Sequence, residues 1–221
     1  MPKILFLSDS HGQHREIPKE WLIETDWIIH AGDISSMGTI PQVADFLDWF
    51  SNVGNYKFRC FIAGNHDWIF EKNPSLAKSM IPKNVTYLES SEIVIDGIKI
   101  FGEPHQPEFC QWAFNVQRGR MKDYWSRVPE DVQLLISHGP PYGILDMSKE
   151  GVLCGCKELL ERLPELKQLR VAVAGHIHEA RGVFEGVDGQ KIINASLLNR
   201  SYEMVNKPYV VDTDGWKIVS S

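Results

Sequence analysis

Five short apolar runs recur along the chain, and each ends in a turn with charged, amide or imidazole side chains. The runs cover residues 3–8, 26–30, 58–63, 131–136 and 169–174. A continuous run of this length is typical of a strand that is covered on both faces in a parallel sheet. The pattern therefore predicts buried parallel strands with polar loops at their C-terminal ends.

Other segments have the spacing of amphipathic helices. Residues 41–50 carry an apolar stripe made of Val43, Phe46, Leu47 and Phe50. Pro41 is acceptable in the first turn of such a helix. Residues 154–163 also predict a helix, which Pro164 ends. A third helix is expected between Arg118 and Arg127, with its basic side chains on a solvated face.

Hairpin signals indicate antiparallel pairing in addition to the parallel strands. Asp96 and Gly97 stand between two short β-type runs at 92–95 and 98–101, which predicts a two-residue turn. Residues 187–190 and 212–215 have similar turn sequences near the C-terminus. We therefore expect an α/β fold with mixed sheets.

Composition favours one folded domain over residues 1–221. Hydrophobic residues make up 43% of the chain and charged residues 24%, and no linker-like segment divides it. The formal charge of −6 argues against a nucleic-acid polymer as partner, because such binding requires many phosphates to be neutralised. A small anionic substrate remains compatible with this charge, since it needs only a local positive site. Nothing in the sequence indicates the oligomeric state.

Cysteine usage and the N-terminal sequence favour a soluble cytoplasmic protein. Four cysteines are too few for a disulfide framework in a chain of this length. Cys154 and Cys156 form a single C-x-C pair without a second ligand pair, so plain thiols are expected there. The apolar run from Ile4 to Leu7 is too short for a signal peptide or a membrane span.

The strand ends carry side chains that are typical metal ligands. They are Asp9, His11, Asp33, Asn65, His66, His138, His176 and His178. Any one of them has an ordinary explanation, as a turn residue or a buried histidine. Together they form an oxygen and nitrogen set that suits Zn, Mn or Fe. If the strands are parallel, these side chains converge at one edge. His30 precedes Asp33 on its strand and is expected to be a structural histidine instead.

The motifs at these positions resemble those of the calcineurin-like metallophosphoesterases. D-x-H, G-D, G-N-H-D, H and G-H-x-H occur in order between residues 9 and 178. Residues 106–109, 112–115, 137–141 and 193–196 are similar to a branch of small phosphodiesterases named for their metallophosphoesterase domain. Some members of that branch lack the first histidine of G-H-x-H, whereas His176 is present here. The resemblance implies a β sandwich of mixed sheets flanked by α-helices.

The resemblance also implies a role for each residue of the motifs. One divalent ion would be held by Asp9, His11, Asp33 and His178, and a second by Asp33, Asn65, His138 and His176. Asp33 would bridge the two ions, for which Mn is the first candidate, with Fe and Zn as alternatives. His66 would protonate or stabilise the leaving oxygen, and Asp67 would orient its imidazole.

The charge of such a site favours phosphodiesters as substrates. Two divalent ions and two aspartates leave a net charge of +2, which a bridging hydroxide and a diester monoanion would cancel. We expect hydrolysis of small phosphodiesters, cyclic nucleotides among the candidates, by attack of this hydroxide. His105, Tyr142 and Asn194 are candidate substrate contacts. The alternatives are a phosphomonoesterase and a non-catalytic binding module that retains the fold.

Overall fold

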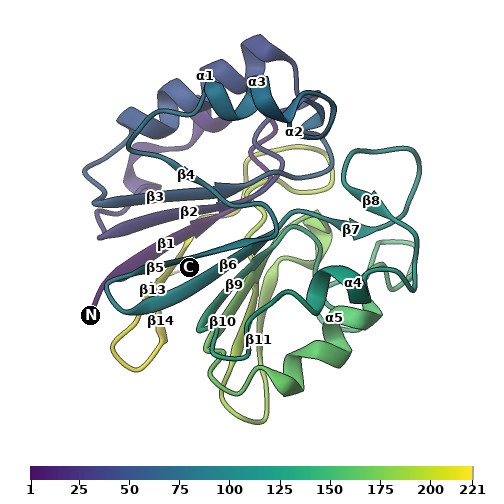
Figure 1. Cartoon of the computed structure of the whole chain (residues 1–221). Helices are drawn as coiled ribbons and strands as arrows, with labels where there is room; N and C mark the ends of the chain where they lie inside the picture. The colour runs from purple at the N-terminus through teal and green to yellow at the C-terminus, as the bar shows by residue number, and fades with distance from the viewer. Residues whose placement is uncertain (221) are drawn as a thin grey trace.

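Two six-stranded sheets packed face to face form the centre of the molecule (Figure 1). The computed structural model describes residues 1–220. The first sheet has the strand order β14-β13-β1-β2-β3-β4. Its strands are β1 (Lys3–Leu7), β2 (Trp27–Ala31), β3 (Phe58–Ile62), β4 (Thr86–Tyr87), β13 (Tyr209–Asp212) and β14 (Lys217–Ser220). Strands β1 to β4 are parallel, and β13 and β14 extend the sheet in antiparallel fashion.

The second sheet has the order β11-β12-β10-β9-β6-β5. Its strands are β5 (Ser91–Ile95), β6 (Ile98–Glu103), β9 (Leu134–Ser137), β10 (Val171–Ala174), β11 (Gly182–Glu185) and β12 (Lys191–Asn194). The four inner strands are parallel, and both edge strands are antiparallel to their neighbours. A separate short pair consists of β7 (Gln106–Pro107) and β8 (Asn115–Val116). The predicted sandwich of mixed sheets is confirmed.

Helices cover the outer face of each sheet (Figure 1). The first sheet is covered by α1 (Ile40–Asn52), α2 (Trp68–Lys72) and α3 (Pro74–Ser79), and the second by α4 (Lys122–Trp125) and α5 (Lys157–Arg162). Single 3-10 turns occur at His14–Glu16, Lys19–Trp21, Leu163–Glu165 and His178–Ala180. Helices α4 and α5 are shorter than predicted. The start of the predicted 154–163 helix is instead tied to a loop, because the backbone N–H of Cys156 donates to the Pro140 carbonyl.

Three hydrophobic layers follow from the alternation of side chains along the buried strands. On β1, Ile4 and Phe6 face the second sheet, while Leu5 and Leu7 face the helices of the first. Phe46 on α1 belongs to the same helix-facing cluster, as its predicted apolar stripe requires. A third cluster packs α4 and α5 against the second sheet. Both faces of each central strand are therefore buried, which explains their continuous apolar sequences.

The hairpin predicted at Asp96 and Gly97 joins β5 to β6. Both residues have positive φ, of 49° and 79°, which is the backbone conformation of a type I′ turn. The two C-terminal hairpins are also present, since β11 pairs with β12 and β13 with β14 in antiparallel fashion. Hairpin turns thus account for the antiparallel strands at the edges of the two largely parallel sheets.

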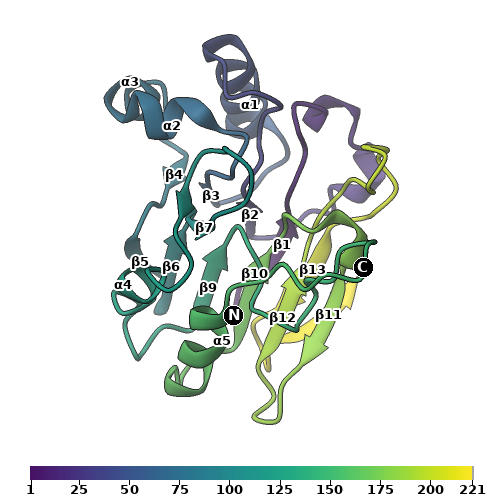
Figure 2. The ribbon, with the colours of Figure 1, turned by 90° about the vertical axis from the view of Figure 1, so that its right-hand side faces the viewer.

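The C-terminal ends of the parallel strands meet at one edge of the sandwich, onto which Figure 2 looks. Backbone hydrogen bonds join the two sheets here. Ser8 donates its N–H to the Ala195 carbonyl, and Leu197 donates to the Ser8 carbonyl, both at 3.0 Å. The loops after β1 and β12 consequently lie side by side.

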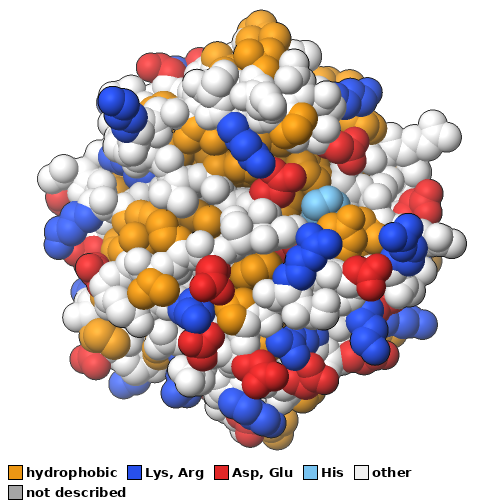
Figure 3. Space-filling model, viewed as in Figure 1, with side chains coloured by type: hydrophobic (Ala, Val, Ile, Leu, Met, Phe, Trp, Pro, Cys, Tyr) orange, Lys and Arg blue, Asp and Glu red, His pale blue; other side chains and the backbone are white. Residues whose placement is uncertain are grey.

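Positive and negative side chains are mixed on one face of the molecule. On the face shown in Figure 3, Lys and Arg side chains are interspersed with Asp and Glu. Among the described residues, no helix has the length and apolar character needed to cross a membrane.

Candidate metal centre

Loops after strands of both sheets deliver the predicted ligands to the edge described above. Asp9 and His11 follow β1, Asp33 follows β2 and Asn65 follows β3, while His138 follows β9 and His176 and His178 follow β10. Three groups of these side chains bring their ligand atoms within 4.8 Å of one another. They are Asp9 with His11 and His178, His11 with Asp33 and His66, and Asp33 with His138 and His176.

The backbone turns sharply at this edge. Asp9, His11, Asp33 and His176 all have φ between 43° and 69°, the left-handed region that residues with a Cβ disfavour by about 1 kcal/mol or more each. At His176 this left-handed turn replaces the extended conformation of the preceding strand β10. Because of this turn, its imidazole joins the group around Asp33, whereas His178 joins the group around Asp9.

The first group is centred on the carboxylate of Asp9. Nε2 of His178 lies 3.4 Å from Oδ1 of Asp9, and Nε2 of His11 lies 4.0 Å from the same oxygen. The two Nε2 atoms of His11 and His178 are 3.2 Å apart. The hydroxyl of Ser196 and the backbone N–H of His176 donate to the Asp9 carboxylate and fix its orientation.

The second group is centred on Asp33. Its Oδ2 atom lies 3.4 Å from Nε2 of His138 and 3.5 Å from Nε2 of His11. Asn65 completes this side, since its Oδ1 atom is 3.0 Å from Nε2 of His138. The other carboxylate oxygen of Asp33 accepts a 2.8 Å hydrogen bond from the backbone N–H of His66. One oxygen of Asp33 thus faces imidazoles from both groups.

Backbone carbonyls orient two of the imidazoles. Nδ1 of His138 donates to the Ala31 carbonyl at 3.0 Å, and Nδ1 of His178 donates to the Asn199 carbonyl at 3.1 Å. With Nδ1 engaged in this way, Nε2, which faces the carboxylates, is the nitrogen that can bind a cation. This arrangement of a second hydrogen bond behind the ligand atom is common among metal-binding histidines.

Two glycines let the chain approach the carboxylates closely. A Cβ at Gly175 would lie 2.1 Å from both Oδ2 of Asp9 and Oγ of Ser8. A Cβ at Gly64 would lie 2.3 Å from Oδ1 of Asp33. Any side chain at either position would displace a candidate ligand, which explains why glycine stands in the G-H-x-H and G-N-H-D motifs.

Burial and charge shift the pKa values of the site in opposite directions. Burial alone would lower the pKa of His138, but the carboxylate of Asp33 raises it to about 9. For His11, burial outweighs the carboxylates and lowers the pKa to about 4. Burial would raise the pKa of Asp9 and Asp33, yet the imidazoles of His178 and His138 hold both below their usual range. Both aspartates are therefore ionised at neutral pH, and positive charge at the site is favourable.

These residues fit divalent cations. The Nε2 atoms stand 3.4 to 4.0 Å from the carboxylate oxygens, beyond the 2.7 to 3.2 Å of ordinary N–H···O hydrogen bonds. Asp9 and Asp33 are at most 2% exposed, so water does not satisfy them. Carboxylate, amide and imidazole donors without sulfur suit Mn, Fe or Zn.

Sequence comparison assigns the chain to a family. The profile of the calcineurin-like phosphoesterases matches residues 2–180, which include all of the ligand groups. The chain belongs to the calcineurin-like phosphoesterase family. The resemblance seen in the motifs is confirmed, and the family implies metal-dependent hydrolysis of phosphoesters.

Individual relatives of this phosphoesterase agree with that assignment. The chain is 34% identical to human metallophosphoesterase domain-containing protein 1, over 95% of this chain and 70% of the relative. A crystal structure of TT1561 from Thermus thermophilus has a TM-score of 0.65 at 14% identity and covers 100% of this chain and 98% of its own. A dimetal phosphatase from Danio rerio has a TM-score of 0.59 at 10% identity, with coverages of 95% and 91%. At these identities the two structures show the fold alone.

His66 lines a cleft of the phosphoesterase together with five of the candidate ligands, His11, Asp33, Asn65, His176 and His178. Asp67, however, does not orient the ring of His66 as expected. Nδ1 of His66 donates to the Ser36 carbonyl at 2.6 Å. The fully buried carboxylate of Asp67 instead accepts hydrogen bonds from the Ser35 hydroxyl and from backbone N–H groups, including that of Gly64. Burial and the nearby charge of Asp33 raise the pKa of Asp67 to about 6. Asp67 therefore positions the loop rather than the imidazole.

The three predicted substrate contacts do not line the cleft. His105 is bound to the buried carboxylate of Glu103, with Nδ1 2.6 Å from Oε1. Tyr142 packs beneath the ammonium group of Lys157, 5.0 Å from its ring centre. Asn194 is fully buried and donates to the Ile177 carbonyl, so it supports the loop that carries the two histidines. Each of these three side chains is thus engaged outside the lining of the cleft.

The cleft is also lined by residues that were not predicted from the sequence. They are Phe109, Trp112, Glu179, Arg200 and Tyr202. Trp112 stacks on His66, with ring centres 4.2 Å apart and planes inclined by 29°. It stands in one of the segments that carried the resemblance, which was the one available signal. Arg200 and Tyr202 belong to an irregular loop after β12, where no periodic pattern indicates which side chains face a site. His30, by contrast, is a structural histidine as predicted, with its ring packed on Phe46.

Proposed function

We propose that this phosphoesterase hydrolyses small phosphodiesters at a site for two divalent metal ions. Asp9, His11, Asp33 and His178 would hold one ion, and Asp33, Asn65, His138 and His176 the other. The oxygen and nitrogen ligands suit Mn, Fe or Zn, and manganese is the first candidate. When bound, the ions would supply positive charge for the phosphate oxygens and lower the pKa of a water nucleophile.

The observation that carries the proposal is the position of Asp33. Its Oδ2 atom lies nearly equidistant from Nε2 of His11 and Nε2 of His138, at 3.5 and 3.4 Å, and these two imidazoles belong to different ligand groups. A carboxylate shared in this way is suited to bridge ions about 3.5 to 4 Å apart. The arrangement supports two adjacent ions rather than one.

The charge of the ligands supports a diester. Asp9 and Asp33 supply two negative charges, so two divalent ions would leave the site with a charge of +2. A hydroxide and a monoanionic diester balance that charge, whereas a monoester dianion exceeds it by one. The interspersed surface charge on the face in Figure 3 gives no support to a polymeric substrate, which would require a basic stripe.

His66 would act on the leaving group. Its Nδ1 proton is engaged by the Ser36 carbonyl, so Nε2 is the nitrogen that can deliver a proton to the departing oxygen. Trp112 on one side of the ring restricts its rotation. The imidazole is thus held in one orientation at the wall of the cleft, without help from Asp67.

Kinetics of two variants with two diesters test this assignment. We expect Asp33→Asn to lower the rate by about a thousandfold or more, with loss of bound metal. We expect His66→Ala to slow a methyl alkyl diester by about a hundredfold or more, but to slow bis(4-nitrophenyl) phosphate much less. A nitrophenolate leaves without protonation, whereas an alkoxide does not. Metal analysis should give two Mn ions per chain in the wild type.

His105→Gln serves as the matched control, because His105 is a partly buried histidine outside the cleft. It should retain wild-type rates on both diesters. Faster turnover of 4-nitrophenyl phosphate than of the diester would reassign the protein as a phosphomonoesterase. Undiminished activity of Asp33→Asn would remove the basis of the metal assignment.

A further inference from the structure

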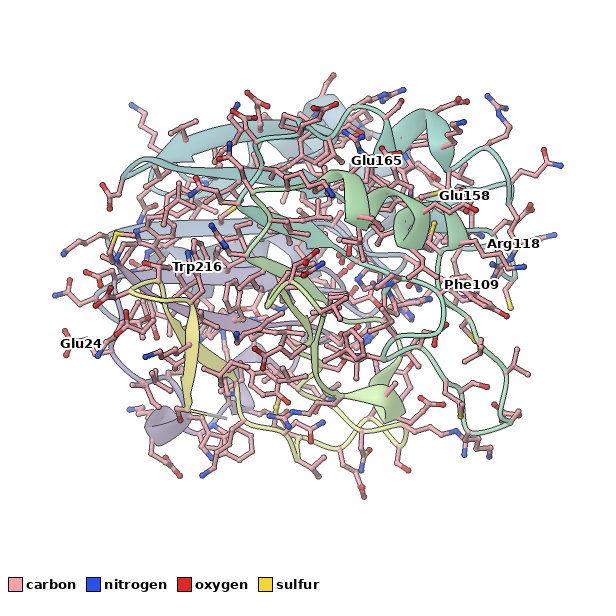
Figure 4. All side chains as sticks on the ribbon, turned by 90° about the horizontal axis from the view of Figure 1, so that it is seen from below. Glu24, Phe109, Arg118, Glu158, Glu165 and Trp216 are labelled. Carbon is pink, nitrogen blue, oxygen red and sulfur yellow. The ribbon has the colours of Figure 1, made fainter. Side chains whose placement is uncertain are left out.

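The loop between β7 and β8 carries two aromatic side chains to the cleft. Phe109 and Trp112 are both half-buried and both line it. The ring of Phe109 meets that of His176 edge-on, with centres 4.8 Å apart. In Figure 4, Phe109 lies on the side of the molecule opposite Trp216 and Glu24. The aromatic pair thus stands beside the candidate ligands, at the entrance to the site.

Hydrogen bonds hold this loop in place. The side-chain amide of Gln106 donates to the Ala113 carbonyl at 2.8 Å and to Oδ1 of Asn115 at 3.0 Å. The amide of Asn115 donates in turn to the carbonyl of Phe109 at 2.8 Å. The backbone N–H of Ala113 donates to the carbonyl of Asn65, which connects the loop to a candidate metal ligand. The position of the two rings relative to the metal centre is therefore set before a ligand arrives.

The rings of Phe109 and Trp112 are not part of the hydrophobic core. Neither belongs to any of the three hydrophobic clusters of the described residues, although the neighbouring Ala113 and Phe114 do. Partly exposed aromatic rings on a fixed loop, next to charged and imidazole groups, are typical of a binding pocket. An aromatic side chain there stacks on planar groups with little loss of its own conformational freedom.

We propose that Phe109 and Trp112 form an aromatic subsite. This subsite selects phosphodiesters in which one ester group carries a planar ring. This inference rests on the proposed phosphodiesterase activity and specifies which part of the substrate the cleft recognises. Trp112 already stacks on His66, so Phe109 is the ring that makes the main contact with the ligand. The cleft has a volume of about 260 Å³, which accommodates a phosphate and one ring.

Binding of a matched pair of phosphonates tests the subsite without turnover. Benzyl methylphosphonate and cyclohexylmethyl methylphosphonate carry the same charge and similar volume, and only the first has a planar ring. We expect calorimetric titration of the manganese-loaded protein to show about three- to tenfold tighter binding of the benzyl compound, the contribution of one aromatic pair. Phe109→Leu should reduce this preference to below about twofold.

Phe184→Leu is the matched control, because Phe184 is an exposed phenylalanine on β11, away from the cleft. It should keep the wild-type preference. Equal binding of the two phosphonates by the wild type, or an unchanged preference in Phe109→Leu, would overturn the aromatic subsite. Binding of adenosine 5′-methylphosphonate distinguishes a nucleobase from a simple aryl group as the ring that the subsite recognises. Tighter binding than the benzyl compound indicates a nucleobase and equal binding a simple aryl group, and both results support the subsite.

Hydrolysis of benzyl methyl phosphate and cyclohexylmethyl methyl phosphate separates the two proposals. If neither is cleaved but the benzyl phosphonate still binds more tightly, the proposed function fails while the aromatic subsite stands. If both diesters are cleaved and the phosphonates bind equally, the subsite fails while the proposed function stands.

Discussion

Removal of metal should make the stability of the protein depend on the protonation of His138. In the metal-free protein, the fully buried imidazolium of His138 pairs with the carboxylate of Asp33. The pKa of His138 rises from 6.5 to about 9 in the folded state, which corresponds to about 3 kcal/mol of stabilisation. Because the folded protein binds this proton more tightly than the unfolded chain, the stabilisation is complete below pH 6.5. It is lost as the pH rises through about 9.

Urea unfolding in the presence of a chelator measures this effect. The free energy of unfolding would be determined at pH 6 and pH 9.5 for the wild type and for His138→Gln. Subtracting the variant from the wild type removes the contributions of the other titrating groups. We expect the difference between the two proteins to fall by about 3 kcal/mol over this range.

Phe184→Leu is the control, because it changes an exposed side chain without a titratable group, and its difference from the wild type should be nearly constant between the two pH values. A difference for His138→Gln that also stayed constant would refute the reasoning. It would mean that the Asp33 carboxylate does not hold a proton on His138 in the folded protein.

Two further predictions concern close packing. Gly175→Ala should reduce the metal bound per folded chain, because its Cβ would lie 2.1 Å from Asp9, whereas Gly139→Ala, with its nearest neighbour at 3.3 Å, should retain the metal. Elemental analysis of both proteins checks this, and full metal content in Gly175→Ala would contradict it. Phe46→Ala removes a fully buried ring between α1 and the first sheet and should lower the free energy of unfolding by about 3 to 5 kcal/mol. Urea unfolding measures it, and a loss below about 1 kcal/mol would be inconsistent with the observed packing.

The sequence predicts those features that depend on local chemistry or strict periodicity. The turn at Asp96 and Gly97 requires positive φ at both positions, so its hairpin is evident from two residues. Likewise, an apolar run such as 4–7 has one stable environment, the interior of the sandwich. The convergence of side chains at strand ends follows from parallel pairing, which the apolar runs indicated.

Features that depend on packing between distant segments could not be predicted in this way. Asp67 was expected to contact its sequence neighbour His66, but its partners Ile34 and Ser35 come from another loop. Asn194 faces the interior because Ser196 and Ile177 offer it hydrogen bonds there. The left-handed backbone of His176 also has no local sequence signal, since glycine, not histidine, is the usual residue in that conformation.

The candidate metal centre is assembled from loops that follow strands of both sheets, which bears on biosynthesis. Residues 9–66 supply the part of the metal centre that follows β1, β2 and β3, and residues 138–178 supply the remainder. A nascent chain that has emerged only as far as β6 carries four of the seven candidate ligands and lacks the strands that hold the other three. The complete set of candidate ligands therefore requires translation past β10 and closure of both sheets.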